Sequence, residues 1–157
     1  PLLFQYLQDR DLWIWALPDS HEVSAAIRSY PFDFDLWQSW LGDDLFDLKM
    51  DGVAILRYQQ REVESIVSRA STIEILSYTV PCLNTTTLIS EVGNVLCQGQ
   101  PFSATYFDTG GKRVFSLRSD ENGLDVSLVA KQFGGGGHAR ASGFSIPAPG
   151  IDLVVPF

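Results

Sequence analysis

Hydrophobic and polar positions alternate with two different periodicities along the chain, and the periodicity changes near residue 70. In the first part apolar residues recur at helical spacing over residues 20–30, 34–41 and 52–70. Ser20 stands where an N-cap would start the first of these segments, and Pro31 ends it. The pattern predicts that residues 1–70 are helical.

After Ser71, the sequence becomes rich in β-branched and aromatic residues. Residues 73–83 predict a strand, residues 85–99 a helix that ends at Gly99, and residues 101–119 a β-hairpin that turns around Gly110 and Gly111. A helix over residues 125–133 and a strand over residues 141–146 complete the order β-α-β-β-α-β. Such alternation is typical of a layered α/β domain. We therefore expect two parts, a helical connecting segment over residues 1–70 and an α/β domain over residues 71–157.

Charge is distributed unevenly between the two parts of the sequence. The formal net charge of −8 lies entirely within residues 1–99, whereas residues 100–157 carry five basic and five acidic residues. An acidic chain disfavours nonspecific binding to a long polyanion, since that binding needs many basic groups. Residues 100–157, which have no net charge, remain compatible with a local site for a ligand that carries few phosphates.

The composition, with 45% hydrophobic and 19% charged residues, is that of an ordinary globular protein. No apolar run is long enough to span a membrane and no signal-peptide pattern opens the chain, so we expect a cytoplasmic protein without membrane partners. Cys82 and Cys97 predict reduced thiols, and the widely spaced His21 and His138 disfavour a zinc site. The chain begins within an apolar, helix-compatible pattern, so we also expect it to be a piece of a longer protein.

Four consecutive glycines, Gly134 to Gly137, precede His138 and connect the last predicted helix to the last predicted strand. Such a run costs conformational entropy unless the backbone needs unusual dihedrals or close approach. One hypothesis is a turn whose successive N–H groups bind an anion, with His138 at its rim. A purely structural turn is the alternative, and the glycines alone do not decide between them.

Several spaced elements in this region together resemble the DHHA1 domain of the DHH phosphoesterase superfamily. They are Ser116-Leu117-Arg118-Ser119, Asp125-Val126, Gly135-Gly136-Gly137-His138 and Ala141-Ser142-Gly143, in the order of that family's pattern. Ser142 stands where the family commonly has alanine. The resemblance is strongest over residues 72–147, and it implies a DHHA1-type α/β fold with a mixed β-sheet.

In such proteins a preceding domain with an Asp-His-His motif binds two divalent metals, usually manganese, and cleaves a phosphoester. This sequence has no Asp-His-His triplet, so we expect no catalytic or metal-binding residues in it and no activity from it alone. The resemblance implies the substrate-binding half of a phosphohydrolase that acts on short single-stranded oligonucleotides or small nucleotides. Its partner would be the absent DHH domain, and a homodimer is left open.

The substrate-binding residues that the resemblance implies share the strand end, the glycine run and the last strand: Arg118, Ser119, Gly134, Gly135, Gly136, Gly137, His138 and Gly143. An arginine offers phosphate a planar fork of donors. Spacing alone favours a surface ion pair of Arg118 with Asp120 or Glu121, and the resemblance reverses that preference. His138 could instead satisfy the turn by hydrogen bonding. Arg140 is a candidate for a charge at the rim of the site.

An aromatic cluster in the helical part has two interpretations, a base-stacking platform or packing surface; its members are Trp13, Trp15, Phe32, Phe34, Trp37 and Trp40. We favour core, or a surface that packs on the absent domain. Two other function classes stay open: an RNA-binding module like the C-terminal domain of alanyl-tRNA synthetase, and a structural or dimerisation domain.

Overall fold

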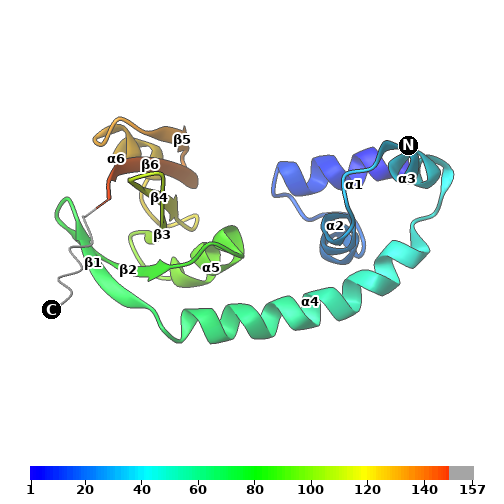
Figure 1. Ribbon diagram of the computed structural model, residues 1–157, viewed down its shortest axis with the longest axis horizontal. Helices are drawn as coiled ribbons and strands as arrows, with labels where there is room; N and C mark the ends of the chain where they lie inside the picture. Colours follow the sequence, from blue (N-terminus) through cyan, green and yellow to red (C-terminus); the bar gives the residue numbers. More distant parts are fainter. Residues whose placement is uncertain (149–157) are drawn as a thin grey trace, which may run out of the picture. The chain divides into compact units, whose positions relative to one another are not determined.

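The computed structural model describes residues 1–148 (Figure 1). Contacts within the chain divide it into two compact units, residues 1–62 and the part that begins at Val63. The division falls inside the 22-residue helix α4 (Phe46–Val67), whereas the helical pattern ends and the first strand begins between residues 67 and 71. Each unit is described by itself below.

The first unit is helical, as the apolar spacing predicts. It comprises α1 (Leu2–Asp11), α2 (Ser20–Ser29), α3 (Phe34–Ser39), a 3₁₀ turn (Trp40–Gly42) and the first part of α4. Its core is a single cluster of apolar side chains: Leu3, Tyr6, Val23, Ala26, Ile27, Trp40, Leu45 and Leu48. The prediction that Ser20 caps α2 is wrong, because Asp19 holds the N-cap position with φ of 56° and Ser20 is the first helical residue.

The buried carboxylate of Asp9 fixes the loop that joins α1 to α2. It accepts hydrogen bonds from the backbone N–H groups of Ala16 and Leu17, at 3.0 and 3.2 Å, and from the hydroxyl of Ser20. These donors, the Ser20 hydroxyl first, hold the pKa of Asp9 below its ordinary value. The loop therefore depends on an ionised Asp9.

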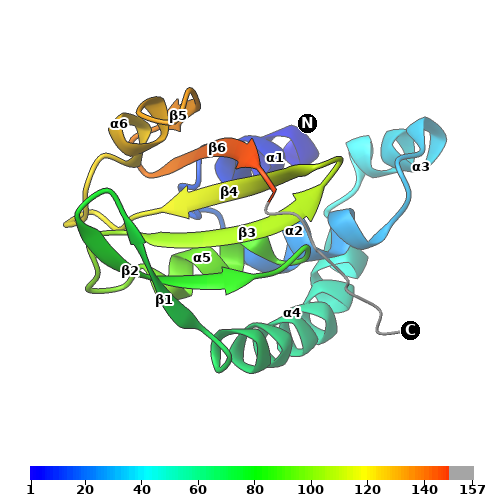
Figure 2. The same ribbon diagram turned by 60° about the vertical axis from the view of Figure 1, so that its left-hand side comes forward.

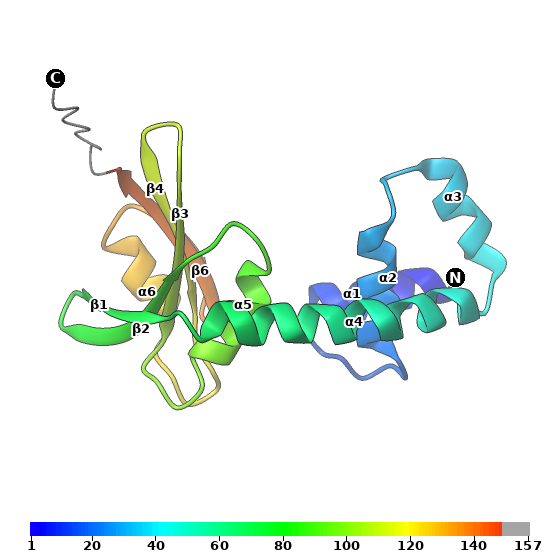
Figure 3. The ribbon, with the colours of Figure 1, turned by 60° about the horizontal axis from the view of Figure 1, so that its bottom comes forward.

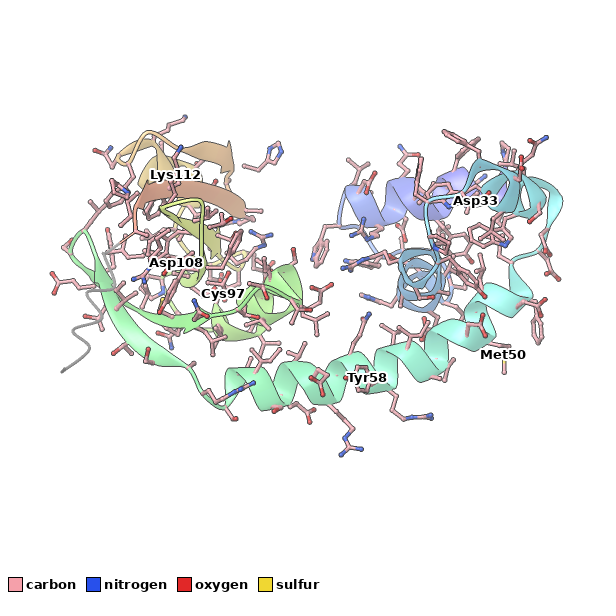
Figure 4. All side chains as sticks on the ribbon, in the orientation of Figure 1. Asp33, Met50, Tyr58, Cys97, Asp108 and Lys112 are labelled. Atoms are coloured by element: carbon pink, nitrogen blue, oxygen red, sulfur yellow. The ribbon has the colours of Figure 1, made fainter. Side chains whose placement is uncertain are left out.

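The aromatic cluster in this unit divides between core and surface. Trp40 is buried, whereas Phe32 and Phe34 are 74% and 77% exposed. On α4, Met50 and Tyr58 also project away from the helix axis and are exposed (Figure 4). Unit 1 thus presents aromatic and apolar surface as well as an aromatic core.

The second unit is built on a mixed six-stranded sheet of order β1-β2-β3-β4-β6-β5 (Figure 2). Its strands are β1 (Ser71–Ile75), β2 (Tyr78–Asn84), β3 (Ser103–Thr109), β4 (Lys112–Arg118), β5 (Gly136–His138) and β6 (Ala141–Pro147). Helix α5 (Ile89–Leu96) connects β2 to β3, the one parallel pair, and α6 (Val126–Lys131) lies between β4 and β5. The predicted α/β class is confirmed.

Two strands were not predicted. The run expected as one strand is an antiparallel hairpin, β1–β2, whose turn lies at Leu76 and Ser77. The glycine run, expected as a turn between a helix and a strand, contributes β5 at the edge of the sheet, and the actual turn follows at Ala139 and Arg140. The sheet therefore has two strands more than the predicted order.

Helices α6 and α5 lie on opposite faces of the sheet (Figure 3). One face packs against α6 through apolar residues: Phe102, Ala104, Phe115, Leu117, Phe144, Val126, Val129 and Ala130. On the other face, Leu83 packs with Val92 and Leu96 of α5 and with the end of α4. None of the helices in residues 1–148 is long and apolar enough to cross a membrane.

Candidate phosphate-binding site

Arg118 and His138, 20 positions apart in sequence, lie in one row across three adjacent strands. Ala141 of β6 pairs with Arg118 of β4 on one side and with His138 of β5 on the other. Residues paired in register point to the same face of a sheet, and neighbouring strands are about 4.8 Å apart, so the two Cα atoms are roughly 10 Å apart. The space between the two side chains lies above the methyl group of Ala141.

The next row on the same face consists of small residues. Ser116 of β4 pairs with Gly143, and Gly143 pairs with Gly136. Helix α5 packs against β3 and β4, so it covers the Arg118 end of these rows. The result is a shallow floor of glycine, alanine and serine with a guanidinium on one side and an imidazole on the other. Because β5 is an edge strand, backbone groups along its outer side have no strand partner in the described sheet.

Three of the four glycines have a reason within the fold. Gly134 ends α6 with φ of 76° and donates its N–H to the carbonyl of Lys131. A Cβ on Gly135 would stand 2.6 Å from Cβ of Phe144 and closer still to the carbonyl oxygen of Gly143. Gly137 has φ of 137° and lies against β6. These glycines serve a helix end and close strand contact.

Gly136 is different. It has no positive φ, and in residues 1–148 no atom beyond its chain neighbours lies within 4 Å of the place where its Cβ would stand. That Cβ would point to the face of Arg118 and His138, because Gly136 and His138 are two positions apart on one strand. The fold therefore leaves this glycine unexplained.

The first two glycines do not supply the free N–H donors that the hypothesis of an anion-binding turn requires. The N–H groups of Gly134 and Gly135 donate to the carbonyls of Lys131 and Ala130, which closes α6. The glycine run offers a ligand close approach to the backbone instead of a nest of amides.

The guanidinium of Arg118 is half-buried, and burial lowers its pKa. Nη1 donates to the carbonyl of Leu117 and Nη2 to the hydroxyl of Ser90, both at 2.9 Å. A guanidinium has five N–H donors, so three take no part in these two bonds. The charge of Glu91 acts in the opposite direction to burial and raises the pKa of Arg118. The ion pair with Asp120 or Glu121 that the sequence also allowed is not formed within residues 1–148.

The side chain of His138 is exposed, and its imidazole makes no hydrogen bond to residues 1–148. The imidazole therefore does not form the hydrogen bond to the turn that was the alternative interpretation. In residues 1–148 the hydrogen bond near this turn is made by the backbone of His138, whose carbonyl accepts from the Ser142 hydroxyl at 2.7 Å. The imidazole is available to a ligand.

Ser119 and Arg140 both serve the loop after β4. The hydroxyl of Ser119, which is 5% exposed, donates to the carbonyl of Leu124 at 2.7 Å. Arg140 donates to the carbonyls of Gly123 and Glu121, each at 2.8 Å. The geometry gives both side chains a structural role, and leaves Arg118, Gly136 and His138 as the residues that face open space.

Sequence reasoning did not count Ser90, Gly93 and Ser116 among the site residues, although they complete the surroundings of Arg118. Ser116 carried a signal, because it alternates with Arg118 along a predicted strand and must share its face. Ser90 and Gly93 are three apart on a predicted helix and share one of its faces, but nothing in the sequence indicates which strand that face meets.

No group of three or more His, Cys, Asp or Glu side chains in residues 1–148 is arranged to hold a metal ion. Cys82 and Cys97 are buried, unpaired thiols, and burial raises the pKa of each. The site is thus a set of donors and glycines, suited to binding an anion.

A comparison with protein families matches residues 90–155 to the DHHA1 domain. The chain carries the DHHA1 domain of the DHH-superfamily phosphoesterases. The matched range contains the four spaced motifs and the whole row from Arg118 to His138. The resemblance inferred from these motifs is confirmed.

Two curated relatives are similar to more of this chain than the DHHA1 match covers. An uncharacterized protein of Acanthamoeba polyphaga mimivirus is 33% identical over 171 residues, which cover 100% of this chain and 39% of that protein. Oligoribonuclease NrnB of Bacillus subtilis is 34% identical over 110 residues, which cover 69% of this chain and 26% of that protein. The chain therefore spans well under half the length of either relative.

Solved structures resemble the chain more distantly. The pGpG-specific phosphodiesterase PggH from Vibrio cholerae aligns with 17% identity and a TM-score of 0.47, covering 66% of this chain and 38% of that one. An exopolyphosphatase-related protein from Bacteroides fragilis aligns with 18% identity and a TM-score of 0.42, covering 72% and 38%.

Proposed function

We propose that the part of the chain from residue 71 onward is the substrate-binding domain of a DHH-family phosphohydrolase that acts on short oligonucleotides or small nucleotides. The observation that carries the proposal is the row Arg118, Ala141, His138 beside an unobstructed Gly136. In this proposal a terminal phosphate lies between the two cationic or donor side chains, above the small residues of β6.

Each residue has a distinct part in this proposal. The half-buried guanidinium of Arg118 supplies charge-assisted hydrogen bonds, which are stronger than neutral ones because burial reduces competition from water. His138 donates a hydrogen bond to the phosphate from the exposed side of the site. Gly136 lets the ligand approach the backbone. Ser119, Gly134, Gly135, Gly137 and Gly143 shape the loop and strands around them.

The charge distribution supports a small ligand. The acidic excess lies in residues 1–99, and residues 100–157 have no net charge. At the site itself the donor side chains are Arg118 and His138. A long nucleic acid would need a broad basic surface. A ligand with one or two phosphates needs no such surface.

We further propose that catalysis depends on a DHH domain outside this sequence that binds divalent metal, with manganese the expected ion. NrnB, of which the chain covers only 26%, is named an oligoribonuclease, and this supports a parent enzyme that cleaves short nucleic acids. A cytoplasmic location and a homodimer belong to the same proposal.

Titration with a 5′-phosphorylated dinucleotide tests the proposal. Arg118→Ala removes charge-assisted hydrogen bonds worth about 1.5–3 kcal/mol, so Kd should rise roughly 10- to 150-fold. Arg113→Ala is the matched control, since Arg113 lies on the same strand but the opposite face and pairs with Asp108 at 2.8 Å. The same dinucleotide without its phosphate should bind weakly to every variant.

Unchanged affinity of Arg118→Ala would overturn the phosphate site. Binding of structured RNA with a steep salt dependence, and no preference for a terminal phosphate, would instead support the RNA-binding module.

A further inference from the structure

The position of Arg118 depends on helix α5, which is tied to the sheet beside it. The hydroxyl of Ser103, fully buried and paired in register with Arg118, donates to the carbonyl of Gly93 at 2.7 Å. Val92 and Leu96 pack into the apolar cluster on this face. The face of α5 that meets Arg118 is therefore fixed.

Gly93 provides the space through which the Arg118 side chain passes. A Cβ on Gly93 would stand 2.8 Å from Cγ and 3.4 Å from Cβ of Arg118. Glycine is disfavoured in the interior of a helix, because it loses more backbone entropy than alanine. The close contact with the arginine explains why this helix has a glycine there.

One turn earlier on the same helix face, Ser90 receives the end of the side chain. Its hydroxyl oxygen accepts from Nη2 at 2.9 Å, while Nη1 donates to the carbonyl of Leu117. Two separate acceptors, one on α5 and one on β4, fix both the place and the plane of the guanidinium. The three remaining N–H groups then have a set direction.

We propose that Ser90 is a positioning residue that orients Arg118 for anion binding. In this proposal Gly93, which has no side chain, leaves the space that the arginine needs to reach Ser90. This inference rests on the proposed function. Ser90 acts through Arg118 and not on the ligand, so its effect must disappear when the arginine is absent.

A double-mutant cycle tests this, with the whole chain and a 5′-phosphorylated dinucleotide as the probe. Ser90→Ala should raise Kd about fivefold, as expected for one lost hydrogen bond that orders the binding group. Ser90→Thr keeps the hydroxyl and should bind like the original protein. In the Arg118→Ala background, Ser90→Ala should have no further effect. Ser68→Ala, at an exposed position of the same unit, is the matched control.

Gly93→Ala provides a second line of testing. Its Cβ must displace the arginine, so Kd should rise at least as much as in Ser90→Ala. The Nε–H resonance of Arg118 in ¹⁵N spectra should shift in both variants and stay in place in Ser90→Thr.

The outcomes separate the two proposals. If Arg118→Ala leaves affinity unchanged, the proposed function fails. If Arg118→Ala weakens binding and Ser90→Ala does not, only the positioning role fails. Equal effects of Ser90→Ala with and without Arg118 also overturn that role, because Ser90 would then act independently of the arginine.

Discussion

Gly135 and Gly136 are neighbours in one glycine run, yet the structure predicts opposite results when each is replaced by alanine. At Gly135 the new methyl group would overlap the backbone of Gly143 and the side chain of Phe144. At Gly136 it would enter open space with an ordinary φ. The first substitution should therefore affect folding, and the second should affect binding.

The magnitudes follow from these contacts. Forcing a methyl group into a packed contact costs about 1–3 kcal/mol, so Gly135→Ala should lower the free energy of unfolding by that amount. Gly136→Ala should raise it by about 0.4–1 kcal/mol, because alanine restricts the unfolded chain and fits the native backbone. For a domain of this size each kcal/mol shifts Tm by roughly 4–8 °C, so the two variants should differ by at least about 6 °C.

Two optical signals separate the units in this experiment. All four tryptophans lie within residues 1–62, so their fluorescence reports the first unit. Far-UV circular dichroism also reports the sheet, and a Tm change seen there without a fluorescence change belongs to the second unit. Titration with the 5′-phosphorylated dinucleotide then measures Kd for each variant.

Gly136→Ala should weaken binding about tenfold, and Gly136→Val more, because a larger side chain occupies more of the ligand's place. The reasoning is refuted if Gly136→Ala destabilises the protein as much as Gly135→Ala does. If both Gly136 variants fold and bind the dinucleotide with unchanged Kd, the ligand does not lie over β5.

Three further predictions concern other parts of the molecule. Acid should disturb the loop that Asp9 holds: its folded pKa is depressed, so its stabilising effect is complete above the ordinary value near 3.9 and is lost as the pH falls below it. Tryptophan fluorescence should therefore change below about pH 4, and an unchanged titration in Asp9→Asn would contradict this assignment. The chain alone should not cleave a dinucleotide with manganese present; turnover that a chelator abolishes would place metal ligands within this sequence. The exposed aromatic residues of the first unit should bind a hydrophobic dye or drive self-association, and a monomer that binds no dye at high concentration would show that this surface needs no covering.

The sequence was most informative where side chains repeat with a clear period. The helices of the first unit follow the spacing of apolar residues, and the β3–β4 hairpin follows from its two alternating runs and the Gly110-Gly111 turn. The β1–β2 hairpin escaped prediction because Leu76 takes a positive φ in a turn without glycine or proline. Strand β5 escaped because glycines carry no hydrophobic pattern.

The candidate site was only partly predictable for a related reason. The motifs indicated which residues to consider, but their arrangement depends on β6 lying between β4 and β5, and strand order is a property of the whole sheet. Ser119 belongs to the same motif as Arg118, yet its hydroxyl faces the loop carbonyls. The role of Ser90 depends on a contact between residues 28 positions apart.

The central place of β6 also affects how the domain is made. Strand β6 is the last described strand in the sequence, but it completes the sheet between two strands that precede it. During synthesis β4 stays an open edge until residues 141–147 have emerged, and β5 has nothing to pair with. A product that terminates before Ala141 would therefore lack the binding row altogether and would expose an unpaired strand prone to aggregation. Pairing of the open edge of β4 and formation of the ligand site thus depend on the same seven residues.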